Sequence, residues 1–233
     1  MANQLDLEEQ EQLDQIKHFW KQYGNPITWI LIAILGAYAS WNGYQYWQRS
    51  QAAQAAAMFD EVQRLSSEGD LSKVERAFKE MQDRFGGTTF AQQSALLVAK
   101  LYEEGGKQEQ AKAALAWVAE KAADAGYQAI ARLRLAAILA QAKDYTKALE
   151  MLAGSFPAEF QPLVADRKGD VLMLQDKPVD ARAEYEKAYK GLDERSEYRG
   201  LVAIKLTALG ADPRPVTDGV AAGAQGTGAE GKK

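Results

Sequence analysis

A run of uncharged residues near the N-terminus limits what this chain can fold into more than any other feature. No charged side chain lies between Gln22 and Gln48, and most of the first half of this run is apolar. As a helix, the segment from Ile27 to Trp47 would rise about 31 Å, and the hydrocarbon core of a bilayer is roughly 30 Å thick. The sequence therefore predicts one transmembrane helix over residues 25–47.

Aromatic side chains flank this run on both sides. Trp and Tyr favour the membrane–water interface, because each has an apolar ring and a polar group. We therefore predict five membrane-interface anchors, namely Trp20, Tyr23, Trp41, Tyr44 and Trp47. Asn25 and Pro26 resemble an N-cap and a first-turn proline, which predicts that the spanning helix begins at this point.

Two other interpretations of the run remain open. Its Ala37-Tyr38-Ala39 string resembles a signal-peptidase site, although the long acidic segment before the run is unlike the short, positive start of a signal peptide. A buried core helix is the second alternative, and such a helix would have to hide an unusually long uncharged segment.

The charges around the run predict its orientation. Lys17, His18 and Lys21 lie close before it, whereas only Arg49 lies close after it. Since cationic residues favour the cytoplasmic side, we expect a cytoplasmic N-terminus. In a bacterium this gives a single-pass inner-membrane protein whose main domain is periplasmic.

The predicted cytoplasmic stub, residues 1–24, has its own pattern. Leu13, Ile16, Trp20 and Tyr23 recur at helical spacing. This stripe predicts an amphipathic helix that rests on lipid, or one that docks against another membrane protein.

Helical periodicity dominates the main domain, residues 48–210, and strand-like alternation is scarce. The strong helix formers after the run predict that the spanning helix continues outward to a stop at residues 66–70. Three later segments repeat one pattern, in which a helix ends, the chain turns through polar residues, and a second helix begins near an alanine. These alanines are Ala111, Ala148 and Ala181, at spacings of 37 and 33 residues.

Such spacings resemble the period of about 34 residues of tetratricopeptide helical hairpins. The predicted fold class is therefore all-α, with one N-terminal transmembrane helix followed by a tetratricopeptide-like helical-repeat domain. The leading tryptophan and closing proline of that repeat are missing, so a generic bundle of helical hairpins remains an alternative.

Stacked hairpins form a concave surface that binds peptide segments. Projection of the groove positions of the repeat onto this chain gives a mixed apolar and charged lining, which suits loose binding of many unfolded segments. The candidate groove residues are Leu96, Lys100, Leu133, Ala137, Asp166, Asp170 and Met173. The alternative is that several of these side chains are buried between helices.

Composition argues against most chemistry. The chain has no cysteine and one histidine, His18, so the main domain contains neither a thiolate nor a histidine metal site, and no Ser-His-Asp triad. Most of the net charge of −4 lies in the first 21 residues, so the main domain lacks the cations that nucleic acid requires. We predict no catalytic residue, no cofactor and no nucleic-acid partner. Residues 211–233, which include five glycines after Thr217, are predicted to form a disordered tail.

Four stretches together resemble a known family, the YfgM-type ancillary subunits of the bacterial SecYEG translocon. They are "EQLDQIKHFWKQYG", the span "PITWILIAILGAYASWNGYQYW", the alanine-rich "SQAAQAAAMFDEV" and "ADRKGDVLMLQDKPVDARAEYEKA", within residues 8–208. The resemblance implies an inner-membrane protein with a periplasmic domain. It further implies association with the SecYEG translocon and with a PpiD-like periplasmic chaperone, and assistance to unfolded exported polypeptides. The glycine-rich tail departs from the family pattern.

Two function classes follow. In the first, the protein assists exported chains beside the translocon and contacts membrane lipid. In the second, it is a membrane-tethered scaffold or regulator that recognises one defined envelope partner. Breadth of binding distinguishes them, because a chaperone binds several unrelated unfolded proteins and a scaffold binds one folded protein.

Overall fold

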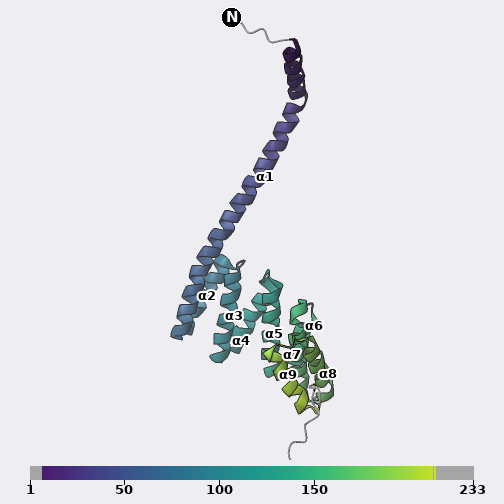
Figure 1. Ribbon diagram of the computed structural model, residues 1–233. Helices are drawn as coiled ribbons and strands as arrows, with labels where there is room; N and C mark the ends of the chain where they lie inside the picture. Colours follow the sequence, from purple (N-terminus) through teal and green to yellow (C-terminus); the bar gives the residue numbers. More distant parts are fainter. Residues whose placement is uncertain (1–6, 212, 214–233) are drawn as a thin grey trace, which may run out of the picture.

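The computed structural model describes residues 7–211 and 213, and the regular elements of this part are all helices (Figure 1). In chain order they are α1 (Leu7–Glu68), α2 (Leu71–Phe85), α3 (Thr89–Glu104), α4 (Gln108–Lys121), α5 (Ala125–Gln141), α6 (Tyr145–Ala153), a 3₁₀ turn η1 (Ala158–Phe160), α7 (Gln161–Leu174), α8 (Pro178–Gly191) and α9 (Glu197–Ala208). The predicted all-α fold is confirmed. The predicted tail lies outside the described residues, apart from residues 211 and 213.

Helix α1 is a single helix of 62 residues that extends away from the other helices (Figure 1). Only its last third joins the helical domain, where Ala55, Val62 and Leu65 are buried against α2 and α3. The predicted continuation of this helix to a stop near Glu68 is therefore confirmed. By mean hydropathy, no helix within residues 7–211 is both long and apolar enough to cross a bilayer.

The predicted helix start at Asn25 and Pro26 is wrong, because α1 runs through both residues. Pro26 lacks the N–H that would bond to the carbonyl of Gln22, and Figure 1 shows α1 changing direction in its dark purple part. The Thr28 hydroxyl donates to the carbonyl oxygen of Gly24 at 2.7 Å. This side-chain hydrogen bond lies next to the place where Pro26 interrupts the backbone hydrogen bonds of the helix.

Consecutive helices pack as hairpins in the order α1–α2, α3–α4, α5–α6 and α7–α8, and α9 follows the last hairpin. The first helix of each pair is called the A helix here and the second the B helix. Successive hairpins stack beside one another, and their A helices are α1, α3, α5 and α7 (Figure 1).

Each A–B turn contains one residue in the left-handed region of backbone space. These residues are Gly69, Gly106, Lys143 and Asp176, with φ of 75°, 71°, 64° and 60°. In the last three hairpins the residue after it donates its N–H to a carbonyl five positions back, as Lys107 does to Tyr102 at 2.7 Å. The polar turns of the sequence pattern therefore share one local geometry.

Small residues let the two helices of a hairpin approach closely. Ala111, Ala148 and Ala181, which open the B helices, are fully buried. In the last hairpin Gly169 of α7 faces Tyr185 of α8, and a Cβ at residue 169 would lie 2.4 Å from the Tyr185 ring. The three alanines that the repeat pattern singles out are thus core residues.

Candidate functional site

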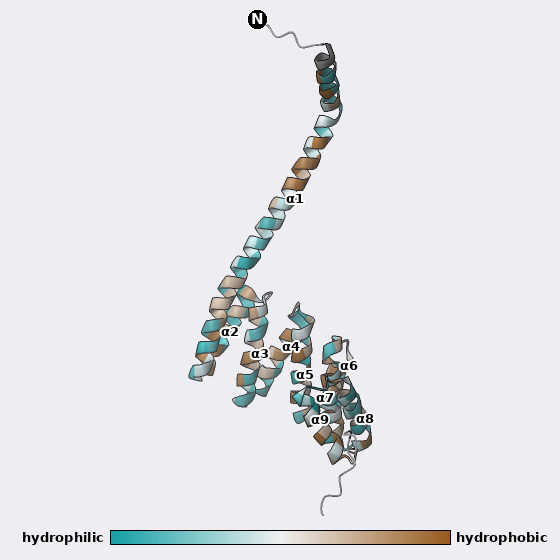
Figure 2. Ribbon diagram, in the orientation of Figure 1, coloured by the Kyte–Doolittle hydropathy of each residue, from teal (hydrophilic) through white to brown (hydrophobic). Residues whose placement is uncertain are grey.

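The first candidate surface is the exposed part of α1. Its large apolar side chains are exposed, and in Figure 2 the ribbon of the most hydrophobic residues forms a brown stretch in the middle of the helix. Trp29 and Leu35, for example, are 67% and 64% exposed. The five predicted interface anchors Trp20, Tyr23, Trp41, Tyr44 and Trp47 are all exposed as well. An exposed apolar patch of this extent is typical of a surface that contacts a membrane or another protein.

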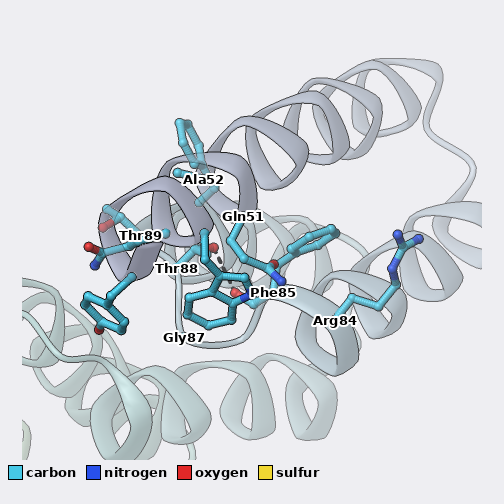
Figure 3. A pocket seen from close by; sticks show the side chains of 11 residues that line it. Gln51, Ala52, Arg84, Phe85, Gly87, Thr88 and Thr89 are labelled. Atoms are coloured by element: carbon cyan, nitrogen blue, oxygen red, sulfur yellow. Dashed lines mark hydrogen bonds between the residues drawn. The ribbon is translucent and has the colours of Figure 1, made fainter. Parts of the chain in front are cut away.

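A pocket of about 340 Å³ lies where this stretch of α1 meets the turn between α2 and α3 (Figure 3). Its α1 wall includes Tyr44 and Trp47, so two of the predicted anchors also line the pocket. The other residues that line it are Gln48, Gln51, Ala52, Arg84, Phe85, Gly87, Thr88, Thr89 and Phe90.

Two polar side chains of this pocket, Thr88 and Arg84, already have partners within the chain. The Thr88 hydroxyl donates to the carbonyl oxygen of Phe85 at 2.8 Å and accepts the N–H of Ala91, which caps α3. Arg84 donates to Glu80 at 2.6 Å, and Figure 3 shows it at the side of the pocket, away from Thr88 and Thr89. The pocket therefore offers mainly aromatic and amide surface, without an uncommitted charge at its centre.

The second candidate surface is the predicted groove, whose residues all lie on A helices. On α3, Lys100 is exposed and pairs with Glu104 at 3.6 Å, whereas Leu96 is buried. On α5, Leu133 and Ala137 are half-buried. The Arg134 guanidinium donates to the carbonyl oxygen of Leu96 at 3.2 Å, which links α5 to α3.

The α7 part of the predicted groove differs from the expectation. Met173 is exposed, but Asp166 is only 1% exposed and Asp170 is half-buried. Both carboxylates accept from the Lys205 ammonium of α9, at 2.8 Å for Asp166 and 2.6 Å for Asp170. Asp166 is therefore inside the contact between α7 and α9, which removes it from any open groove surface.

Two tyrosines complete this cluster. Tyr198 donates its hydroxyl to Asp166 at 2.6 Å, and Tyr185 donates to Asp170 at 2.9 Å. Burial, followed by the adjacent Asp170 carboxylate, raises the pKa of Tyr185 well above its ordinary value. Burial and the hydrogen bond to Asp166 raise the pKa of Tyr198 in the same direction. Both hydroxyls thus remain protonated donors, and the cluster fixes α9 to the last hairpin.

Sequence reasoning missed the partners in this cluster. Lys205 lies 39 positions after Asp166, and no local pattern links a lysine to a carboxylate at that distance. The available signal was the repeat period, which places α9 in the position of a further A helix beside α7.

The array of helical hairpins agrees with the comparison of this chain with known proteins. A family model described as "Tetratricopeptide repeat-like domain" matches residues 17–211. A protein of Neisseria gonorrhoeae named "Ancillary SecYEG translocon subunit" is 31% identical over 204 residues, which cover 87% of this chain and 98% of that protein. The chain belongs to the ancillary SecYEG translocon subunit family.

Other members of the ancillary subunit family are more distant. Proteins with the same name from Haemophilus influenzae and Escherichia coli are 26% and 24% identical, each over 78% of this chain, and the match covers 89% and 87% of them. The resemblance inferred from the sequence is thus confirmed. The family's helical-repeat fold and the names of these relatives favour a role in binding rather than catalysis.

A solved structure also resembles this chain in fold. The crystal structure of BtubC (BKLC) from P. vanneervenii superposes with a TM-score of 0.50 and is 20% identical, over 69% of this chain and 82% of that one. This similarity supports the helical-repeat architecture alone.

Proposed function

We propose that this protein is a single-pass inner-membrane protein that associates with the SecYEG translocon and assists newly exported polypeptides in the periplasm. In this proposal a PpiD-like chaperone is a second partner, and α1 contacts membrane lipid through residues 25–47. The observation that carries the proposal is the continuity of α1, which joins a long exposed apolar stretch directly to the core of a helical-repeat domain.

The membrane contact rests on side-chain type and exposure, since mean hydropathy does not classify α1 as a spanning helix. The uncharged stretch contains Trp, Tyr, Asn and Gly beside its aliphatic residues, which lowers its mean hydropathy. Trp and Tyr nevertheless suit the boundary of a bilayer. The apolar residues between Trp29 and Leu35 project on several sides of the helix, as a lipid-facing helix requires.

The binding of exported chains rests on the exposed residues of the A helices. Lys100 and Met173 are exposed, and Leu133 and Ala137 are partly exposed, so the surface of the stacked hairpins offers both charged and apolar groups. A surface without a dense cluster of one charge favours loose binding of varied segments over tight recognition of one charged motif. The names of the relatives support the translocon as the place of this binding.

Site-specific photocrosslinking in living cells tests both parts of the proposal. A photoreactive amino acid would replace Trp41 or Trp47 in the proposed membrane contact, and Lys100 or Met173 in the groove. A matched probe at Lys79, which is exposed on α2, serves as the control. Crosslinked products would be identified by mass spectrometry.

The expected result is translocon subunits at the α1 probes and several unrelated exported proteins at the groove probes, with neither at Lys79. A single recurrent folded partner, with no translocon subunit, would instead assign the protein to the scaffold class. Extraction of the protein from membranes by alkaline carbonate would contradict the membrane contact.

A further inference from the structure

The pocket between α1 and the turn from α2 to α3 lies where the exposed apolar stretch of α1 ends and the domain begins. Its α1 wall runs from Tyr44 to Ala52, and its other wall includes the turn at Gly87 (Figure 3). The wall therefore starts among the predicted interface anchors and ends inside the helical domain.

Distances along α1 place this pocket at the level of lipid headgroups when residues 25–47 lie in a bilayer. A helix rises about 1.5 Å per residue, so the α1 wall of the pocket ends about 7 Å beyond Trp47. The polar headgroup layer extends about 5–7 Å beyond each side of the hydrocarbon core. The pocket thus lies in the layer that contains the phosphates and ester groups of a phospholipid. This step rests on the proposed membrane contact of α1.

The side chains that line the pocket are rich in hydrogen-bond donors and include no carboxylate. Tyr44, Trp47, Gln48, Gln51 and Thr89 each carry an O–H or N–H group. The ester and phosphate oxygens of a phospholipid accept hydrogen bonds and donate none. The lining therefore complements the polar part of a phospholipid.

Two amide donors of the α1 wall are free to bind a ligand. Gln54, which lies just outside the pocket, donates to Ser50 at 3.3 Å. In the described part of the chain, the side chains of Gln48 and Gln51 form no such hydrogen bond. Their amide groups can therefore donate to a bound molecule without breaking a contact within the protein.

Aromatic rings supply the apolar part of the lining. Tyr44 and Trp47 are 55% and 56% exposed, and Phe85 and Phe90 contribute from the side of the turn. Donors beside aromatic rings suit an amphiphile, in which a polar head adjoins apolar chains. A phospholipid is also the molecule that surrounds α1 in a bilayer, so it reaches the pocket without a further partner.

A soluble phosphate ion suits this pocket less well than a lipid does. Arg84 is the one cation among the described residues that line it, and its guanidinium donates to Glu80 at 2.6 Å. A free anion would gain little charge stabilisation there and would leave the aromatic wall uncovered.

We propose that the pocket between α1 and the α2–α3 turn binds the headgroup and ester region of a phospholipid from the leaflet on the domain side of the membrane. Oxygen atoms of the lipid accept from Gln48, Gln51 and Trp47, and the aromatic rings border the first part of its chains. The bound lipid contacts both α1 and the domain, which keeps the domain in one orientation relative to the bilayer.

Photoactivatable lipids test the proposal with the full chain. The protein is placed in nanodiscs of phosphatidylethanolamine and phosphatidylglycerol that also contain a phosphatidylethanolamine with a diazirine in its headgroup. A second sample contains a lipid with the diazirine at the end of an acyl chain. After irradiation and digestion with trypsin, mass spectrometry locates the adducts along the chain.

We expect headgroup adducts within residues 85–90, which belong to the tryptic peptide of residues 85–100. The tryptic peptide of residues 101–107 contains the turn at the other end of α3 and should carry no adduct. The two turns are separated by the length of α3, about 24 Å. The acyl-chain probe should label residues 22–49, which tests the membrane contact of α1 separately.

Two variants test the pocket itself. Gly87→Leu fills it, since a Cβ at this residue meets no atom within 4 Å, and should remove most of the headgroup adducts. Gln51→Glu replaces a donor with a carboxylate that repels the lipid phosphate, and should lower their yield about threefold or more.

The matched controls are the same substitutions at exposed positions outside the pocket. Gln54→Glu lies one turn farther along α1, and Gly200→Leu lies on α9, where a Cβ also meets no atom within 4 Å. Both should leave the yield of headgroup adducts unchanged. Circular dichroism verifies that all four variants are folded.

Two results would overturn the proposal and leave the proposed function standing. The first is labelling of residues 22–49 by the acyl-chain probe without headgroup adducts in residues 85–90. The second is headgroup adducts that Gly87→Leu and Gln51→Glu both leave unchanged, since the turn then touches the membrane surface outside the pocket.

Two further results would assign the pocket differently. Adducts that form in nanodiscs but not in membranes of the native bacterium would show that a protein covers the pocket, which contradicts the proposal. A lack of acyl-chain adducts throughout residues 22–49 would refute the membrane contact of α1 and this inference together.

Discussion

The cluster around Asp166 shows how single residues fix the end of the helical array. Asp166 is buried and accepts from Lys205 and Tyr198, which both belong to the segment after α8. A buried carboxylate needs such partners, because it has lost its hydration. The contact between α7 and α9 therefore depends on the charge of Lys205 as well as on apolar packing.

Lys205→Met tests this dependence. The change leaves Asp166 buried without its cation and should lower the free energy of unfolding by on the order of 3 kcal/mol. Urea unfolding followed by circular dichroism in mild detergent measures the loss. Lys187→Met, which removes an exposed ammonium that pairs with Glu184 at 2.6 Å, is the control and should cost at most about 1 kcal/mol. Equal losses in the two variants would contradict the role of the cluster.

Two glycines give opposite expectations for one substitution. Gly169→Ala would place a Cβ 2.4 Å from the Tyr185 ring and should destabilise the protein by about 1–3 kcal/mol. Gly200→Ala, in α9, meets no atom within 4 Å and should stabilise it by about 0.5–1 kcal/mol through helix propensity. Thermal unfolding of both variants measures the difference, and a shift of the same sign in both would refute the explanation.

At the scale of elements, helix caps define where the hairpins begin. Asp124 precedes α5, and its carboxylate accepts the N–H groups of Gly126 at 2.7 Å and Tyr127 at 3.1 Å. Asp124→Ala should therefore cost about 1 kcal/mol of stability, measured by urea unfolding. Asp83→Ala, within the exposed face of α2, lacks this role and should change stability little. A null effect at Asp124 would show that packing alone positions α5.

The sequence predicted those elements whose signals are local. The polar turns at Gly106 and Asp176 and the buried alanines Ala111 and Ala181 follow from spacing and helical period, and the structure has them at these places. Pro26 was misread because a proline is compatible both with the first turn of a helix and with a bend inside one.

The candidate groove was less accessible to sequence reasoning than the fold. The seven residues given by the projection lie on A helices, but the projection could not show that α9 contacts the buried Asp166. That contact is a salt bridge between residues 39 positions apart, and a salt bridge at such a distance produces no periodic pattern in the sequence. The membrane contact of α1 and the groove's role in binding stay predictions.

At the scale of the whole molecule, α1 belongs to two regions at once. Its residues before Gln48 are largely exposed, whereas Ala55, Val62 and Leu65 are part of the domain core. A chain that begins at residue 48 should therefore fold with a cooperative thermal transition. A chain that begins at residue 70 exposes the apolar surface of α2 and α3 and should unfold at lower temperature or aggregate. Similar transitions for both chains would show that α1 is dispensable for the core.

The continuity of α1 also sets a direction for the domain. Each residue added to a helix turns everything beyond it by about 100° and advances it by only about 1.5 Å. One alanine inserted between Gln48 and Ala55 would hardly lengthen the molecule, yet it would point the stacked hairpins to a different side of the axis of α1. Such insertions should therefore impair partner contacts to a degree that depends on how far they rotate the domain about the axis of α1. An insertion of seven residues, which is nearly two full turns, should return the domain to almost its original orientation.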